Sequence, residues 1–252
     1  MSFPILEHDP TREALIEPTK VNKKRDMPQS CVICFFKDVI EKVVSEHDAQ
    51  VVIENRWEDG PHPVYEIEYR QQRLAFFHPG IGSALSASLL EEVIAAGCRK
   101  FIACGGCGIL EKEIATGHLL VVSAAVRDEG TSYHYLPPAR EVLANPQGVK
   151  VLVDLLTERG IPHLVGKTWT TAAPYRETPA KIRLRREDGC LAVEMEAAGM
   201  MAVAQFRDAP FGQVLYAGDD LSGSEWDSRG WQRLLEVREQ LFWLGADAVL
   251  SL

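Results

Sequence analysis

Short apolar runs alternate along this chain with segments whose apolar residues recur every three to four positions, and this alternation limits the possible folds most strongly. Residues 31–36 form a continuous apolar run of strand length, and Val39, Ile40, Val43 and Val44 follow it at helical spacing. Fully apolar strands that alternate with amphipathic helices are typical of a parallel or mixed sheet. The sequence therefore predicts an α/β fold, a single domain whose central mixed sheet is flanked by helices on both faces.

Further runs of these two kinds follow to the end of the 252 residues. We expect strands at residues 65–69, 73–78, 101–104, 118–126, 191–193 and 213–217, and helices at residues 83–96, 149–159, 195–206 and from residue 231 almost to the C-terminus. The first thirty residues are polar and interrupted by prolines. We therefore expect residues 1–30 to form an N-terminal arm outside the core, and residues 31–252 to form the folded domain.

Charge and cysteine content restrict the partners and the location of the protein. Lysine and arginine total 27 against 36 aspartates and glutamates, and the net charge of −9 argues against binding to nucleic acid or to an anionic membrane. No apolar run is long enough to span a membrane, and no signal peptide is expected. Six cysteines without an export signal are typical of reduced, buried thiols. We therefore expect a soluble, cytoplasmic protein.

Two Cys-x-x-Cys pairs, Cys31/Cys34 and Cys104/Cys107, are the best candidates for metal ligands. The two pairs are much further apart in the chain than the pairs of a zinc ribbon. Residues three apart on a strand also point to opposite faces, so Cys31 and Cys34 cannot both reach one metal without a turn between them. We expect no metal site.

Four loops rich in glycine or polar residues follow expected strands, at residues 78–83, 104–108, 193–196 and 217–223. Ligands of such sheets bind beyond the carboxyl ends of the strands, so we expect these loops to meet around one ligand.

Two of these loops are glycine clusters. Gly80 and Gly82 lie between a strand and a helix, where backbone N–H groups can face an anion, but Leu85 occupies the third glycine position of a dinucleotide-binding motif. Gly105 and Gly106 follow a buried strand, where the missing side chains allow a ligand to approach the backbone. A tight turn without a ligand is the alternative explanation of both clusters.

Residues 193–199 place two carboxylates, Glu194 and Glu196, on either side of Met195 where a buried strand becomes a helix. Acidic residues in a first helical turn also favour the helix dipole, which is the structural alternative. The flanking residues are apolar, however, so we expect buried carboxylates that need hydrogen-bond donors. Vicinal hydroxyls of a sugar supply two donors to one carboxylate, and the segment therefore predicts a sugar site.

Asp219 and Asp220 end the last expected strand. Adjacent side chains point in different directions, so we expect one carboxylate to face the site and the other to cap the turn. Repulsion between the two carboxylates raises one pKa, which suits a general acid. A turn whose aspartates only cap the backbone is the alternative.

In their order and spacing, these segments resemble the nucleoside phosphorylase/uridine phosphorylase family, which includes the hexameric purine nucleoside phosphorylases. The resemblance extends from about residue 74 to residue 222 and rests on residues 80–82, 105–108, 193–199 and 218–219. It implies the fold of that family, with residues 31–252 as a nucleoside phosphorylase-like catalytic domain.

The resemblance also implies roles for individual residues. Glu196 resembles the glutamate that clamps the ribose hydroxyls, with Glu194 as its nearby partner and Met195 packed on the ribose. Asp219 resembles the aspartate that protonates a purine leaving group, and Tyr175 lies in the stretch that borders the base. The expected residues are therefore Glu196 and Asp219 as catalytic, Glu194, Met195, Glu196 and Ile81 as ribose-binding, and Tyr175 and Asp219 as base-binding.

Two arginines that bind phosphate in that family are missing from this chain. The loop at residues 35–39 has no arginine, and Ala103 and Gly106 occupy the second phosphate-binding stretch. For the anion we expect the amides of Gly82, Gly105 and Gly106, helped by Lys37, Arg127 and Arg56, the last of which resembles an arginine lent by a neighbouring subunit.

The resemblance implies an enzyme, a pentosyltransferase that cleaves the N-glycosidic bond of a nucleoside by phosphorolysis to free base and ribose 1-phosphate, as in purine salvage. Inorganic phosphate is then a co-substrate, and no metal or organic cofactor is needed. Two alternatives stay open: a nucleosidase that uses water, which the missing arginines favour, and a non-catalytic nucleoside-binding protein. The choice between purine and pyrimidine also stays open.

Relatives in that family form dimers or trimers of dimers in which one subunit completes the site of its neighbour. The resemblance therefore implies a homo-oligomer, either a dimer or a hexamer, with Arg56 or His8 near the pocket of the partner.

Overall fold

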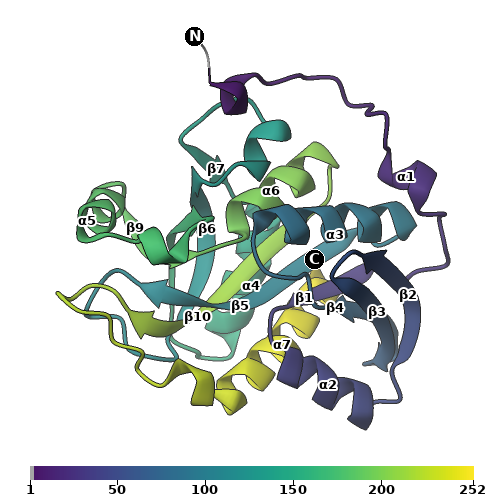
Figure 1. Ribbon diagram of the computed structural model, residues 1–252. Coiled ribbons are helices and arrows are strands. Elements are labelled where there is room, and N and C mark those ends of the chain that lie inside the picture. The colour runs from purple at the N-terminus through teal and green to yellow at the C-terminus, as the bar shows by residue number, and fades with distance from the viewer. Residues whose placement is uncertain (1–2) are drawn as a thin grey trace.

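The computed structural model describes residues 3–252, and its strands form one mixed sheet (Figure 1). Neighbouring strands follow the order β10-β6-β8-β9-β5-β1-β4-β3-β2, and β7 pairs with β6. The strands are β1 (Ser30–Cys34), β2 (Gln50–Trp57), β3 (Gly60–Tyr69), β4 (Gln72–Phe77), β5 (Lys100–Ile109), β6 (Leu119–Asp128), β7 (Glu141–Leu143), β8 (His163–Thr171), β9 (Cys190–Glu194) and β10 (Phe211–Asp220).

Part of the sheet closes on itself. β10 pairs with β6 at one edge and with β5 at the other, so β5, β9, β8, β6 and β10 form a ring. β5 lies parallel to β1 and β10 but antiparallel to β9, and β2, β3 and β4 form an antiparallel extension beyond β1. The sheet is therefore mixed.

Helices cover both faces of the sheet, as Figure 1 shows for α3 and α6 on one side and α2 and α7 on the other. One apolar cluster joins the sheet to α3 and α6, and a second joins it to α2, α4 and α7. The helices are α1 (Pro18–Val21), α2 (Lys37–Glu46), α3 (Ser83–Ala96), α4 (Pro146–Glu158), α5 (Pro179–Glu187), α6 (Ala197–Phe206) and α7 (Leu235–Ser251). The predicted fold class is confirmed.

Strand β1 shows how the two clusters are divided. Cys31 and Ile33 pack in the cluster under α3 and α6, whereas Val32 and Cys34 pack in the opposite one. Cys31 and Cys34 therefore face opposite sides of the sheet, as period-two alternation requires. All six cysteines are buried and free.

The expected elements miss three strands, β2, β7 and β8, and two helices, α1 and α5. β8 is central to the ring, but three of its buried residues are threonines, which give it no apolar run. Two of them, Thr168 and Thr170, are buried because their hydroxyls donate hydrogen bonds to Glu194. α5 is strongly polar and buries only Arg185.

The N-terminal residues run over the surface outside the sheet, through α1 and a short 3-10 helix, Pro4–Leu6 (Figure 1). The segment is anchored where Glu17 and Met27 are buried and where the Arg25 N–H donates to the carbonyl of Ala96. Within residues 3–252, no helix has the length and apolarity that crossing a membrane requires.

Helix α4 approaches strand β10 closely at Gly148, so a substitution of this glycine tests the packing of the two elements. A Cβ at Gly148 would lie 2.1 Å from the carbonyl oxygen of Phe211, which is backbone and cannot move aside. We expect Gly148→Ala to destabilise the protein by about 1–3 kcal/mol, the usual cost of overpacking, as measured by urea unfolding. Gly245→Ala is the matched control, because its Cβ would meet Ile102 at 3.5 Å, an ordinary contact. Equal stability of the two variants would contradict this packing.

Candidate active site

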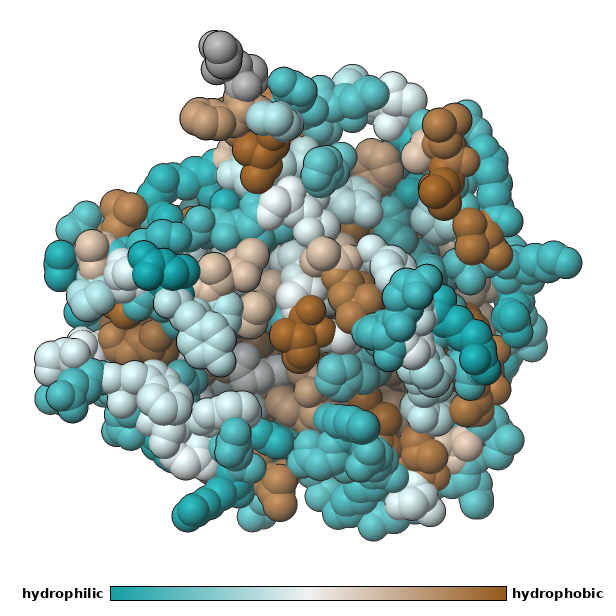
Figure 2. Space-filling model, viewed as in Figure 1, coloured by the Kyte–Doolittle hydropathy of each residue, from teal (hydrophilic) through white to brown (hydrophobic). Residues whose placement is uncertain are grey.

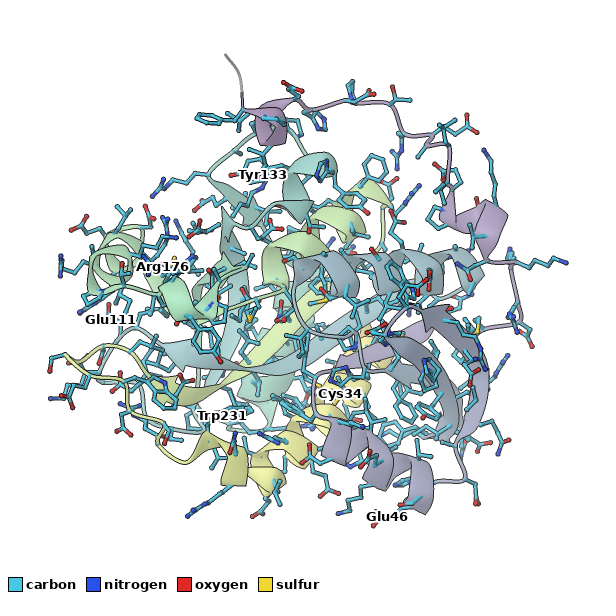
Figure 3. The ribbon with its side chains drawn as sticks, in the orientation of Figure 1. Cys34, Glu46, Glu111, Tyr133, Arg176 and Trp231 are labelled. Carbon is cyan, nitrogen blue, oxygen red and sulfur yellow. The ribbon has the colours of Figure 1, made fainter. Side chains whose placement is uncertain are left out.

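A cavity of about 630 Å³ lies where β1, β5, β9 and β10 end. All four segments expected to meet around a ligand contribute: Ile81 from the first, residues 105–108, residues 193–196, and Gly218, Asp219 and Leu221 from the last. Two of them are not the expected loops, because residues 105–108 lie within β5 and Gly218 and Asp219 lie within β10. Residues 35–38, Glu177, Tyr216, Trp231 and Arg238 complete most of the wall. Figure 2 shows this face of the molecule hollowed near its centre, and Figure 3 labels Trp231 below that hollow.

Glu196 is the best-positioned carboxylate for a sugar. It is buried at the start of α6, it lines the cavity, and its Oε1 accepts a hydrogen bond of 2.7 Å from the N–H of Gly82. Gly82 has φ +84°, a conformation that favours glycine, and this turn aims its N–H at the carboxylate. Ser83 adds a second link to the same turn, because its hydroxyl donates to the carbonyl of Met195 at 3.0 Å.

Glu194 also lines the cavity, but its oxygens are used within the protein. Oε2 accepts hydrogen bonds from the N–H groups of Glu196 and Ala197, at 2.7 and 2.6 Å, and so caps the first turn of α6. Oε1 accepts from the hydroxyls of Thr170 at 2.6 Å and Thr168 at 3.4 Å. With four donors, Glu194 is built to hold the Glu196 backbone in place.

Burial raises the pKa of both glutamates, and the charge of Glu194 raises the pKa of Glu196 further, to about 8. Hydrogen bonds from backbone N–H groups and hydroxyls favour the charged form of a carboxylate. Glu194 has four such bonds, whereas Glu196 has two, from Gly82 and Met195. These bonds therefore favour a negative charge on Glu194 more strongly than on Glu196.

The two aspartates at the end of β10 point in different directions, as expected: one faces the cavity and the other caps the following turn. Asp219 lines the cavity, and its Oδ2 accepts a hydrogen bond of 2.7 Å from the indole of Trp226. Asp220 is not part of the wall: it accepts from the Ser222 N–H at 2.7 Å and forms an ion pair with Arg229. A shift in register between residues 217 and 220 of β10 accompanies this divergence.

The sequence reasoning missed Glu177, which faces the cavity from the turn after β8. Burial, together with the nearby charge of Asp219, raises the pKa of Glu177 to about 7. The expected base-binding stretch ended one residue earlier, at Arg176. Tyr175, predicted to border the base, is instead 98% exposed and lies outside the cavity wall, to which Pro174 and Glu177 of the same turn belong.

Two cations line the cavity, Lys37 and Arg238. Lys37 was expected there; it begins α2, is mostly exposed and lies 3.7 Å from Glu41. Arg238 was missed because it lies on α7, far from every motif in the sequence. Its side chain is nearly buried between the rings of Phe36 and Trp231, and it contacts Asp38 only loosely, at 3.4 Å.

Gly105 and Gly106 line the cavity as expected, but aromatic rings lie against them. A Cβ at Gly105 would lie 3.1 Å from the ring of Phe35, and one at Gly106 would lie 3.1 Å from the ring of Tyr216. These glycines therefore make room for the two rings that form this part of the wall.

Three further residues expected at the anion site do not line the cavity. The Gly82 N–H is used by Glu196. Arg56 lies on β2, with 77% of its side chain exposed, and forms an ion pair with Glu54. A role of Arg56 at the site of a partner subunit stays a prediction. Arg127 is buried elsewhere, against Ser132 and the carbonyls of Leu136 and Pro137.

Comparisons with known proteins agree with this arrangement. The family model of the Phosphorylase superfamily matches residues 30–239, and the chain therefore belongs to that superfamily. Guanosine phosphorylase of Halorubrum lacusprofundi is 26% identical over 167 residues, which cover 66% of this chain and 68% of the relative. Alignments with other curated relatives cover as little as 38% of the relative.

Solved structures share the fold. Uridine phosphorylase from Vibrio fischeri superposes with a TM-score of 0.76 at 18% identity, over 93% of this chain and 99% of the other. AMP nucleosidase from Bacteroides thetaiotaomicron superposes with a TM-score of 0.73 at 22% identity, over 90% of this chain and 89% of the other.

The buried glutamates predict a pH dependence of stability. Their pKa values are raised above the ordinary 4.5, so the folded protein keeps protons that the unfolded chain releases. This contribution is fully present below pH 4.5 and is lost as the pH rises through about 8. The free energy of unfolding of the wild-type protein should therefore fall between pH 5 and pH 9. We expect this fall to be smaller in Glu196→Gln by at least about 1.4 kcal/mol, the value of one pKa unit.

Urea unfolding at several pH values measures this slope. The exposed Glu113→Gln is the matched control and should keep the wild-type slope. A slope unchanged in Glu196→Gln would show that Glu196 is ionised throughout this range.

Proposed function

We propose that this protein cleaves the N-glycosidic bond of a nucleoside by phosphorolysis, giving a free base and ribose 1-phosphate. One observation carries the proposal: a buried glutamate suited to sugar hydroxyls, Glu196, and an acid at a strand end, Asp219, line one cavity in a member of the Phosphorylase superfamily. The transition state of such a reaction resembles an oxocarbenium ion, with positive charge on the ribose and negative charge on the departing base.

Glu196 holds the ribose in this proposal. Its carboxyl faces the cavity from a fixed position, because the Gly82 N–H and the capped start of α6 orient it. When the two hydroxyls of a ribose donate to it, they favour its charged form, and that charge then stabilises the cationic sugar. Met195 and Ile81, which line the same cavity, pack against the ribose.

Asp219 and Glu177 form the base end of the cavity. Their charges interact, and burial favours the protonated form of Glu177 near neutral pH. Asp219 donates a proton or hydrogen bond to the departing base, and Glu177 contacts the edge of the base. An acidic end of this kind suits a base that presents N–H groups.

Phosphate binds beside Arg238 and Lys37, the two cations of the wall. The Arg238 guanidinium is preorganised between the rings of Phe36 and Trp231, and its loose contacts with Asp38 leave donors for an anion. An arginine fork matches the geometry of a phosphate.

Hydrolysis is the second candidate, and a specific observation favours it. Phe35 and Tyr216 cover Gly105 and Gly106, the glycines expected to offer their amides to phosphate. A water molecule needs less room and no positive charge. The two reactions differ in whether base release requires phosphate.

The proposal includes a cytoplasmic homo-oligomer, a dimer or a hexamer, that needs no cofactor. Six free thiols support a reducing compartment. The exposed Arg56 on β2 supports a contribution to a neighbouring site, as does the position of His8 in the N-terminal segment.

Phosphate dependence tests the reaction type. We expect release of free base from purine or pyrimidine nucleosides, followed by chromatography, to require inorganic phosphate. Arg238→Met should raise the KM for phosphate by about 10- to 100-fold, because a hydrogen bond to a charged group contributes about 1.5–3 kcal/mol. Arg233→Met is the control, since Arg233 is exposed in the same segment and lies outside the wall.

Release of base without phosphate would select hydrolysis instead. Binding of nucleosides with no release under either condition would reduce the protein to a nucleoside-binding protein.

The two aspartates test the general acid. We expect Asp219→Asn to lower kcat by about 10²–10⁴, the range for a positioned proton donor, with little loss of stability. A nucleoside whose base is already a good leaving group should restore most of the activity, because it needs no proton. Asp220→Asn is the control: it should keep kcat within a few-fold but lower the melting temperature, since it weakens the ion pair with Arg229. Exchange of these two phenotypes would contradict the assignment.

A further inference from the structure

A second cleft, of about 280 Å³, lies between the end of β6, residues 133–140 and helix α5. Three arginines line it, Arg127, Arg140 and Arg185, and no carboxylate is among the residues of its wall that the structure describes. Figure 3 labels Tyr133 beside this region, below the N-terminal 3-10 helix that Figure 1 shows next to β7. Leu6 of that helix contributes to the wall.

Arg127 is a buried charge whose counter-ion, Glu129, does not contact it directly, because the Ser132 hydroxyl lies between them, accepting from Arg127 and donating to Glu129. It is 5% exposed, and its guanidinium donates to three neutral oxygens: the Ser132 hydroxyl at 2.9 Å, the Pro137 carbonyl at 2.8 Å and the Leu136 carbonyl at 3.2 Å. Among residues 3–252 it forms no ion pair with a carboxylate, and burial lowers its pKa. Because no described carboxylate contacts the guanidinium directly, its remaining N–H groups are available to an anion that enters the cleft.

Arg140 and Arg185 share their carboxylate partners with each other and with Lys181. Asp188 accepts hydrogen bonds from both Arg140, at 2.7 Å, and Arg185, at 2.7 Å. Asp128 lies 3.7 Å from Arg185 and also binds Lys181. The Nε of Arg185, whose residue is 8% exposed, is buried without a hydrogen-bond partner in the part of the chain that the structure describes.

The geometry of Arg127 is fixed before any ligand arrives. Its guanidinium lies 4.0 Å from the centre of the Tyr133 ring, and the Tyr133 hydroxyl donates back to the Arg127 carbonyl at 3.2 Å. Three hydrogen bonds and a stacked ring hold the guanidinium in one orientation. A preorganised donor loses little entropy when it binds an oxyanion.

We propose that this cleft binds a small phosphate monoester, with the phosphate on Arg127, Arg140 and Arg185 and the organic group against Leu6 and Pro138. Guanidinium forks match the oxygens of a phosphate, and three of them converge here. The remaining space of the cleft, bordered partly by apolar side chains, accommodates the esterified group.

Calorimetric titration of full-length Arg238→Met, whose large cavity binds phosphate weakly, with ribose 5-phosphate, inorganic phosphate and ribose tests this proposal. We expect ribose 5-phosphate to bind more tightly than either inorganic phosphate or ribose. Arg140→Gln should weaken ribose 5-phosphate at least about tenfold, as loss of a charged hydrogen bond predicts. This side chain is 58% exposed, so the variant should fold, whereas Arg185→Gln removes a buried side chain and serves as the second variant.

Two controls locate the binding. Arg183→Gln changes an exposed arginine of the same helix outside the cleft and should leave the affinity unchanged. Wild-type protein should bind ribose 5-phosphate at the cleft with the same affinity as Arg238→Met, and any additional binding that Arg238→Met loses belongs to the large cavity. Loss of affinity in Arg238→Met but not in Arg140→Gln would overturn the proposal, as would equal affinity for phosphate and its ester or no binding of either at 10 mM.

Discussion

The carboxylate of Glu194 is the point on which the site depends. It joins three elements, because it accepts hydrogen bonds from two hydroxyls of β8 and from the first two backbone N–H groups at the start of α6, while its own backbone ends β9. A charge buried in this way is stable only while all its donors are present. The position of Glu196, and through Gly82 the turn before α3, follows from this arrangement.

The sequence predicts the centre of the site better than its rim. Glu196 follows the buried strand β9 and Asp219 lies near the end of β10, and a strand end determines where a side chain emerges. Glu177 and Arg238 reach the cavity from a turn and from α7, and nothing local in the sequence reveals where a distant element will pack. Arg127 illustrates the same difficulty: its residue type suits an anion, but only the folded chain shows which cleft it faces.

The absence of β8 from the expected strands has a physical cause. Apolar runs identify strands that are buried among hydrocarbon, as in β1 and β5. β8 is buried against a carboxylate instead, so its threonines resemble those of a loop although they lie in the middle of the ring. Polar residues that satisfy one another inside a protein leave no hydrophobic pattern in the sequence.

Closure of the ring also determines where another chain can extend the sheet. In the described strand order, β10 at one end is already paired with β5, and free edges are left on β2 at the other end and on the three-residue β7, which is paired with β6. An unpaired edge offers a row of free N–H and C=O groups to any extended peptide, and charged side chains on that edge discourage such pairing. Glu54 and Arg56 lie on β2, so this open strand carries charged side chains that discourage pairing with other extended chains.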